Sequence, residues 1–157
     1  MASPTETDTI RSAFLQQMWD HDPGGTGATF VSPDGGTTVR SVDMRDYTDF
    51  SVACMTTVLG GNGPTLLEIV AADNAALSTN AIVIKTSGTI AADAVGDWAI
   101  ETCTAAEIAQ EGADNGSSPR YVGGRITCHH TGDEAAVAYF AVPKRPTKDL
   151  TAQTTIA

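Results

Sequence analysis

The chain has 157 residues, of which 41% are hydrophobic and 6% aromatic, a length that suits one domain burying roughly two thirds of its unfolded surface. Its 19 acidic residues outnumber its 9 basic residues and give a net charge of −10, which argues against a surface for nucleic acid or anionic lipid because both need cations. The start of the chain lacks a basic region followed by an apolar stretch, and no window approaches the roughly 18 apolar residues of a membrane helix, so we expect neither a signal peptide nor a membrane span.

Residues 1–27 are predicted to form an N-terminal arm that contains a short helix. The apolar residues of this stretch recur at spacings of four and one, which would place them on one face of a helix: Ile10, Phe14, Leu15, Met18 and Trp19. A strand that begins the sheet fits the same brief run nearly as well. A loop from Asp20 to Gly27 would end this segment.

Residues 28–143 are predicted to form a β-sandwich domain. Short segments of alternating apolar residues, separated by Gly, Asn, Asp and Pro, predict strands at 28–31, 37–42, 50–59, 66–72, 81–86, 98–103, 121–130 and 135–142. These strands do not alternate with helices of about 10 to 15 residues, so an α/β fold is disfavoured. The sequence therefore predicts an all-β fold with one or two short helices, arranged as a two-sheet, jelly-roll-like β-sandwich.

A capping box predicts where one short helix begins. Thr104 can accept a hydrogen bond from the backbone three residues on, and Glu107 can reach back to the Thr104 amide. The helix would run through Gln110 or Glu111 and stop near Gly112.

Residues 144–157 are predicted to form an extended C-terminal arm, since Pro143 and Pro146 would end the sheet. The arm holds Lys144, Arg145 and Lys148 against Asp149. The rest of the chain is strongly acidic, so the arm differs from it in charge.

No residue cluster predicts a metal site, a cofactor site or an enzyme. Asp20, His21 and Asp22 are adjacent in a predicted loop and lack distant partners, so a structural or solvated loop is the better interpretation. Neighbouring strand residues point to opposite faces, so Cys128, His129 and His130 indicate a core cysteine beside histidines at a strand end. The Gly-rich loops lack a following Lys-Ser/Thr, and no Gly-x-Ser-x-Gly turn occurs.

Three cysteines, Cys54, Cys103 and Cys128, lie far apart in strand-like contexts. An odd and sparse set without a CxxC pair is typical of reduced thiols in a protein made in a cytosol.

Three packing and turn motifs occur along residues 28–142. They are Val42 to Tyr47 leading into a strand, the 98–103 strand followed by the 104–109 cap, and Arg120 to Thr127. In this combination the chain resembles small structural proteins encoded in the head-gene clusters of tailed bacteriophages.

The resemblance implies a virion component, a capsid decoration or cement protein on the outer surface of the shell, made in the host bacterial cytoplasm. It implies the major capsid protein as partner and a homo-oligomer on the capsid, with no nucleic acid and no membrane. The two arms would dock on the capsid, and the candidate docking residues are Lys144, Arg145, Lys148, Phe14 and Trp19.

Two alternatives stay open. The first is another phage structural role, as a head-to-tail connector or a tail protein. The second is a carbohydrate-binding β-sandwich, which needs an exposed aromatic side chain to stack on a sugar ring. Most aromatic residues, Trp98 among them, lie in strand positions that we expect to be core.

Overall fold

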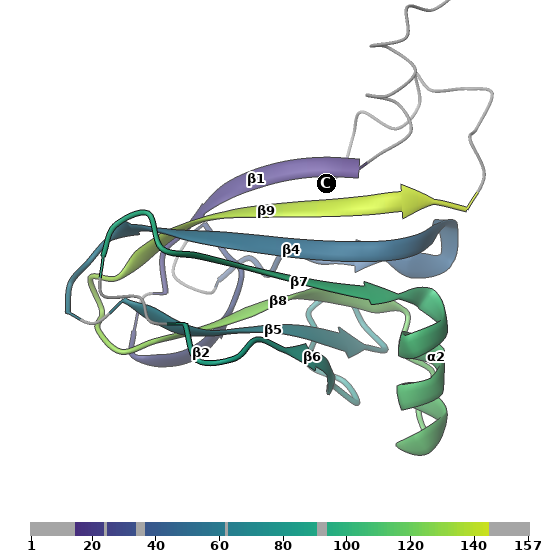
Figure 1. Cartoon of the computed structure of the whole chain (residues 1–157). Helices are drawn as coiled ribbons and strands as arrows, with labels where there is room; N and C mark the ends of the chain where they lie inside the picture. The colour runs from purple at the N-terminus through teal and green to yellow at the C-terminus, as the bar shows by residue number, and fades with distance from the viewer. Residues whose placement is uncertain (1–14, 24, 34–36, 62, 91–93, 145–157) are drawn as a thin grey trace, which may run out of the picture.

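The structure is a computed structural model that describes residues 15–23, 25–33, 37–61, 63–90 and 94–144. Two antiparallel sheets pack face to face, and one helix stands at one end of them (Figure 1). The elements in chain order are β1 Leu15–His21, β2 Gly27–Phe30, β3 Val42–Asp43, the 3₁₀ turn η1 Met44–Asp46, β4 Tyr47–Val58, β5 Pro64–Ala72, β6 Ile82–Thr86, β7 Trp98–Thr104, α2 Ala105–Asp114, β8 Tyr121–Cys128 and β9 Glu134–Pro143.

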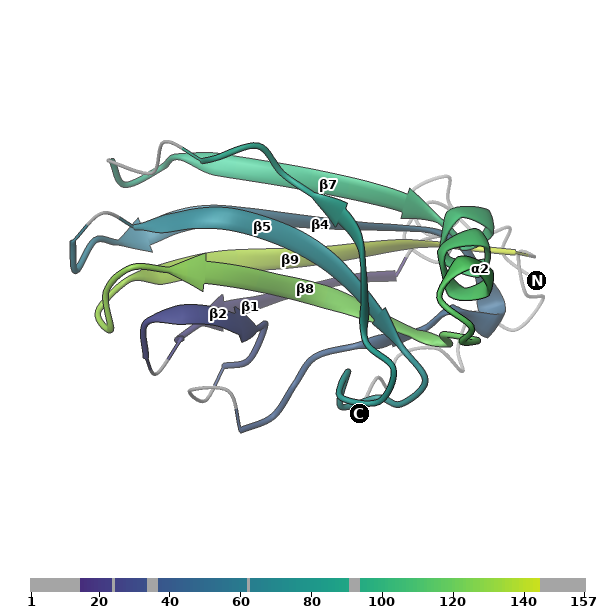
Figure 2. The same ribbon diagram turned by 90° about the horizontal axis from the view of Figure 1, so that it is seen from below.

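The strand order is that of a jelly roll. Sheet A has the order β1-β9-β4-β7, and sheet B has the order β2-β8-β5-β6 with the short β3 also paired to β8. Apart from the neighbouring strands β2 and β3 and the pair β5 and β6, successive strands alternate between the sheets, as Figure 2 shows from below. This interleaving of two sheets is the double Greek key of jelly-roll domains. The predicted all-β, jelly-roll-like sandwich is confirmed.

The core is formed by alternate residues of each strand. In β4 the predicted inward set of Phe50, Val52 and Cys54 is buried, and in β8 the buried alternation includes Val122, Ile126 and Cys128. Most buried side chains are Val, Ile, Ala and Cys, and the largest buried one is Tyr139. Small side chains let the sheets approach closely, because stacked sheets pack about 10 Å apart.

Helix α2 begins where the capping box predicts. The Thr104 hydroxyl accepts a hydrogen bond from the Glu107 N–H at 3.1 Å, and the Glu107 carboxylate accepts one from the Thr104 N–H at 2.8 Å. The same carboxylate pairs with Lys85 of β6 at 2.6 Å. These contacts tie α2 to the end of both sheets.

Two sequence-based expectations need correction. Leu15–His21 is strand β1, paired with β9, so the helical interpretation is wrong for residues 15–19 and this part of the 1–27 segment belongs to the sandwich. The register with β9 decides this, because a strand docked on a sheet gains hydrogen bonds that a short isolated helix lacks. Of the strand predicted at 37–42, only Val42 is in a strand among the described residues. The rest of the predicted arms, 1–14 and 145–157, lies outside the described residues.

Candidate interaction surface

The described part of the chain shows no cluster of metal ligands. No group of three or more His, Cys, Asp or Glu side chains there could hold a metal ion. Within the same residues, no helix is both long and apolar enough to cross a bilayer. Burial raises the pKa of all three cysteine thiols, to about 11 for Cys54 and about 12 for Cys103 and Cys128, so each is a thiol at neutral pH.

His21 is a structural residue at the end of β1, not a loop ligand. Its side chain is fully buried, its Nδ1 accepts a hydrogen bond from the Ser32 N–H, and its Nε2 lies 3.3 Å from the Thr29 hydroxyl. Burial lowers the pKa of His21, although the Asp22 carboxylate opposes this shift. The neutral ring therefore joins β1 to the segment around β2.

The outer face of sheet A is apolar. Cross-strand register places Met18 beside Ala138, Ala138 beside Ala53, and Ala53 beside Ile100. The next row along the sheet holds Ala136, Met55 and Trp98. We define the apolar face as the residues on the side of the sheet A strands that faces away from the core, namely Met18, Ala53, Met55, Trp98, Ile100, Ala136, Ala138 and Phe140.

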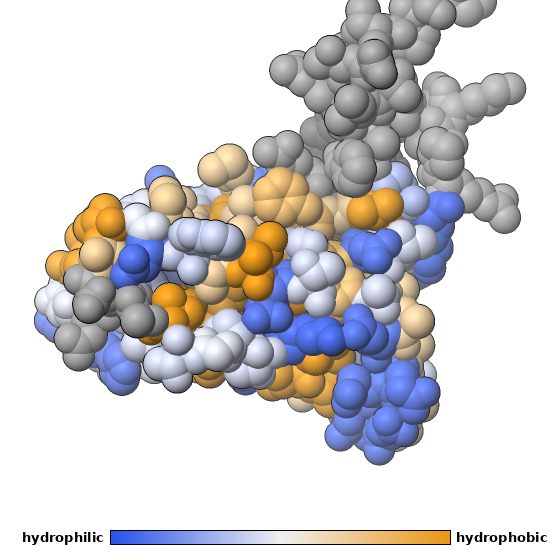
Figure 3. All heavy atoms as spheres, in the orientation of Figure 1, coloured by the Kyte–Doolittle hydropathy of each residue, from blue (hydrophilic) through white to orange (hydrophobic). Residues whose placement is uncertain are grey.

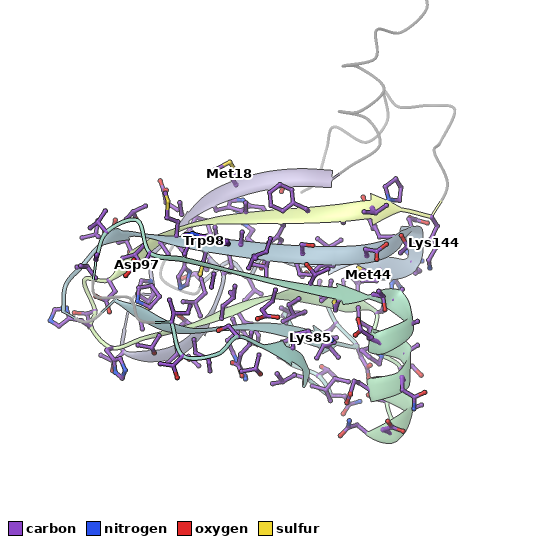
Figure 4. The ribbon with its side chains drawn as sticks, in the orientation of Figure 1. Met18, Met44, Lys85, Asp97, Trp98 and Lys144 are labelled. Carbon is purple, nitrogen blue, oxygen red and sulfur yellow. The ribbon has the colours of Figure 1, made fainter. Side chains whose placement is uncertain are left out.

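Four large side chains of the apolar face are exposed to solvent. The exposed fractions are 66% for Met18, 44% for Met55, 67% for Trp98 and 49% for Ile100. The expectation that Trp98 belongs to the core is therefore wrong: alternation along β7 points Cys103 inward and Trp98 outward. Figure 4 shows the Met18 side chain pointing away from the sandwich, and Figure 3 shows hydrophobic side chains along the same upper side of the molecule.

The rim of the apolar face is acidic. Outward positions of the four strands include Asp20, Asp49 and Glu134, and none of the described outward positions is Lys or Arg. The outer face of sheet B differs, since an ion pair between Arg125 and Glu68 at 2.7 Å crosses it and the Arg125 guanidinium lies over Phe30. The outer face of sheet A therefore exposes apolar side chains that no ion pair between described residues crosses, unlike the outer face of sheet B.

Both chain ends leave the sandwich at one corner of sheet A. Leu15, the first residue of β1, is the Cα partner of Ala141, three residues before Lys144. Lys144 continues β9 and is held there, because its N–H donates to the Asp46 carbonyl at 2.8 Å and its Nζ donates to the Arg45 carbonyl at 2.7 Å.

A pocket of about 280 Å³ lies at this corner (Figure 4, near Met44 and Lys144). Its apolar wall includes Met44, Ile108 and Pro119, and its cations are Arg45, Arg120 and Lys144. Arg120 and Arg45 share Asp43, and the hydrogen bond from Arg120 lowers the pKa of Asp43 to about 2. Three of the cations of an acidic protein thus meet where the C-terminal segment begins.

The predicted docking residues fall into three groups. Lys144 lies in the corner pocket, while Phe14, Arg145 and Lys148 lie outside the described residues. Trp19 faces inward, where its ring meets that of Tyr139 edge-on at 4.9 Å and packs against the core. Sequence reasoning missed Met18 as an outward residue because a helical period puts Met18 and Trp19 on one face, whereas a strand separates them.

The comparisons with known proteins assign the chain to no family. No protein-family model matches the chain, and no curated protein sequence matches it. Among solved structures, that of the Gt strain of infectious bursal disease virus matches at 13% identity and a TM-score of 0.34, covering 85% of this chain and 32% of that chain. The D431N mutant VP2 protein of the same virus, in T=1 particles, matches at 14% identity and a TM-score of 0.20, covering 92% of this chain and 41% of that one. The chain thus spans about a third of the first structure's length, and neither match assigns it a function.

Proposed function

We propose that the chain is a structural subunit of a virus particle, of the type that decorates and cements the outer surface of a tailed-bacteriophage capsid. The observation that carries this proposal is the exposed apolar face of sheet A, whereas an ion pair between Arg125 and Glu68 crosses the outer face of sheet B. Exposed, contiguous apolar area on a folded domain marks an interaction site. A jelly roll is also common among capsid domains, although the fold alone assigns no function.

The charges around the apolar face favour the capsid over a second copy as the partner on this surface. Two copies that met face to face would bring Asp20, Asp49 and Glu134 of one copy toward the same carboxylates of the other. Opposed carboxylates in a closing interface are repulsive. The apolar face fits an apolar surface with a cationic rim, which we assign to the major capsid protein.

The apolar face is too small to form a stable interface alone. Four strands about 4.8 Å apart and about 20 Å of strand length give a flat area of roughly 400 Å², whereas a stable interface buries about 800 Å² on each partner. In our proposal, the remaining contacts come from the corner pocket and from the two chain segments that begin beside it. Lys144, Arg145, Lys148 and Phe14 are therefore retained as docking residues. Trp19 supports the core beneath them.

Copy number in purified particles tests the proposal. Particles from a host that carries the encoding genome are purified on a density gradient, and mass spectrometry counts this chain relative to the major capsid protein. The resemblance to phage decoration proteins leads us to expect hundreds of copies per particle. Electron microscopy should locate these copies on the shell. About a dozen copies would instead assign the connector or tail role, and absence from the particle would reject all of these structural roles.

Carbohydrate binding is the second candidate function, because Trp98 is exposed beside a groove that is also lined by Asp97, Ser87 and Thr89. An aromatic face flanked by polar groups can stack on a sugar ring. A glycan array probed with the wild-type chain and with Trp98→Ala tests this candidate. Binding that Trp98→Ala removes would favour it, and no binding by the wild-type chain would exclude it.

A further inference from the structure

The open edge of β7 borders a groove. Among the described strands, β7 pairs with β4 alone, so it is an edge of sheet A (Figure 1). A groove of about 460 Å³ runs beside it, lined by Asp97 to Ile100 on one wall and by Ser87 to Ile90 on the other. The second wall is held in place, because the Ser87 N–H donates to the Leu67 carbonyl at 2.8 Å and the Ile90 N–H to the Thr65 carbonyl at 2.9 Å.

The backbone of β7 presents hydrogen-bonding groups to this groove. The Thr56 N–H donates to the Asp97 carbonyl at 2.8 Å, so residue 97 faces β4. Backbone groups of an antiparallel strand alternate sides, so the N–H and C=O of Trp98, Ile100 and Thr102 face the open edge. An unpaired edge next to exposed Trp98 and Ile100 is a template for an added strand.

Residues 150–156 have the sequence of such a strand. Leu150, Ala152, Thr154 and Ile156 alternate with Thr151, Gln153 and Thr155, and this run is as long as β7. β-branched and apolar residues at a period of two favour a half-buried strand. Before this run, Arg145 and Lys148 carry positive charge toward a body in which residues 1–143 hold 6 basic and 18 acidic groups.

We propose that residues 150–156 of one copy add as a strand to the open edge of β7 in a second copy. The residues between Lys144 and Leu150 span at most roughly 20 Å when fully extended, and Lys144 and Trp98 lie at opposite ends of sheet A (Figure 4). Within one copy the segment would have to cross the end of the sandwich where α2 stands (Figure 2) before it turned along β7. A neighbour's groove has no such obstacle.

The contact is heterologous, since an arm on one copy meets an edge on the next. Such contacts close into a ring when the rotation between copies allows it. The apolar face points perpendicular to the sheet and stays open in this arrangement. This contact between copies can therefore form whether or not the chain binds a capsid.

The mass of the purified chain in solution tests the proposal. We measure it by light scattering after gel filtration for the full chain, for a chain that ends at Asp149, and for Ile100→Pro. Ile100→Pro removes one N–H from the open edge without touching the pairing with β4, and Ile100→Thr is its matched control because it keeps that N–H. We expect the full chain and Ile100→Thr to form oligomers, and the truncated chain and Ile100→Pro to run as monomers near 16.2 kDa.

A mixing experiment gives the sharpest result. The truncated chain keeps its groove and lacks the strand, whereas Ile100→Pro keeps the strand and lacks a working groove, so an equimolar mixture should form a one-to-one dimer and nothing larger. Circular dichroism establishes that each variant is folded. If Ile100→Pro does not fold, the comparison of mass between the full chain and the truncated chain still tests the proposal. A monomeric full chain at every concentration, or an oligomer that survives truncation, would overturn the proposal.

Discussion

The hydroxyl of Tyr139 in sheet A accepts a hydrogen bond from the backbone N–H of Gly124 in sheet B at 2.6 Å. The same hydroxyl donates to the Arg40 carbonyl at 3.1 Å. The ring between these contacts meets Trp19 and Phe50 edge-on, at 4.9 Å and 5.0 Å between ring centroids. The buried Tyr139 side chain thus joins the two sheets. Its hydroxyl provides hydrogen-bond partners for two backbone groups, the Gly124 N–H and the Arg40 carbonyl.

Tyr139→Phe should lower the free energy of unfolding by about 1 to 3 kcal/mol, because it keeps the ring and leaves a buried N–H without its acceptor. Denaturant unfolding measures the change, and the dependence on denaturant should stay constant because the exposed area is unchanged. Tyr121→Phe, at a partly exposed ring beside Arg120, is the matched control and should change stability by less than about 0.5 kcal/mol. Equal losses for both variants would contradict the assigned role of the Tyr139 hydroxyl.

Gly124→Ala should destabilise the sandwich by about 1 to 3 kcal/mol through overpacking. A Cβ at this position would lie 3.0 Å from a methyl carbon of both Val31 and Val52, so the two sheets would have to move apart locally. Gly88→Ala is the control, because a Cβ there meets nothing within 4 Å. Thermal unfolding of the pair measures the difference, and a Gly124→Ala protein as stable as Gly88→Ala would show that the core is looser than described.

The double variant Met55→Thr, Trp98→Thr should reduce binding to capsids by at least about tenfold, since each side chain contributes about 1.5 to 3 kcal/mol when fully buried. Its thermal unfolding should change little, because both side chains are exposed in the isolated chain. Co-sedimentation with capsids that lack the chain measures binding. Val83→Thr, an exposed apolar residue of sheet B, is the control and should bind normally. Normal binding by the double variant would remove the apolar face from the proposed interface.

Replacement of Lys144, Arg145 and Lys148 by Gln should weaken capsid occupancy most at low salt, because salt screens charge pairs at exposed sites. Residues 150–156 are unchanged in this variant, so the proposed strand addition should persist, weakened only by the lost attraction of Arg145 and Lys148 to the acidic body of the next copy. Occupancy measured between low and high salt, with Lys85→Gln as a distant control, separates the two roles of the C-terminal segment. Undiminished occupancy at every salt concentration would exclude these cations from docking.

Stability should fall as pH falls below about 6.5, the unfolded pKa of histidine. Burial lowers the pKa of His21 in the folded state, so the folded chain binds fewer protons than the unfolded chain between the two values. The contribution of the neutral ring is therefore fully present above the unfolded pKa and is lost as pH falls through the folded one. His21→Gln should flatten this part of the curve of unfolding free energy against pH, and a curve of unchanged slope would contradict the role assigned to the buried ring.

A second pH effect lies at lower pH, at Asp133. Burial raises the pKa of this carboxyl, but hydrogen bonds from the backbone N–H groups of His130, Gly60 and Gly61 outweigh burial and lower the pKa overall. The stability that Asp133 contributes is present above the unfolded carboxyl pKa and is lost as pH falls through the folded value. An Asp133→Asn variant should therefore lose less stability than the wild-type chain between about pH 5 and pH 3.

Local pattern in the sequence was enough to identify most strands and the start of α2. The alternation of Phe50, Val52 and Cys54 determined which side of β4 is buried, because side chains of a strand alternate faces whatever the strand pairs with. The capping box at Thr104 and Glu107 likewise needs only neighbouring backbone groups. The all-β class and the jelly-roll-like sandwich followed from these local signals.

Tertiary structure alone decided how β1 folds and where Trp98 lies. Leu15–His21 is a strand because β9 offers it a ladder, and no residue within the segment encodes that partner. Trp98 is exposed because β7 is an edge strand whose outer face no described residue covers, whereas its alternation pattern would suit a buried face equally well. Where the pattern does not distinguish the two faces of a strand, as in β7, which face meets the core depends on contacts between residues far apart in the chain, and so does which strand remains an edge.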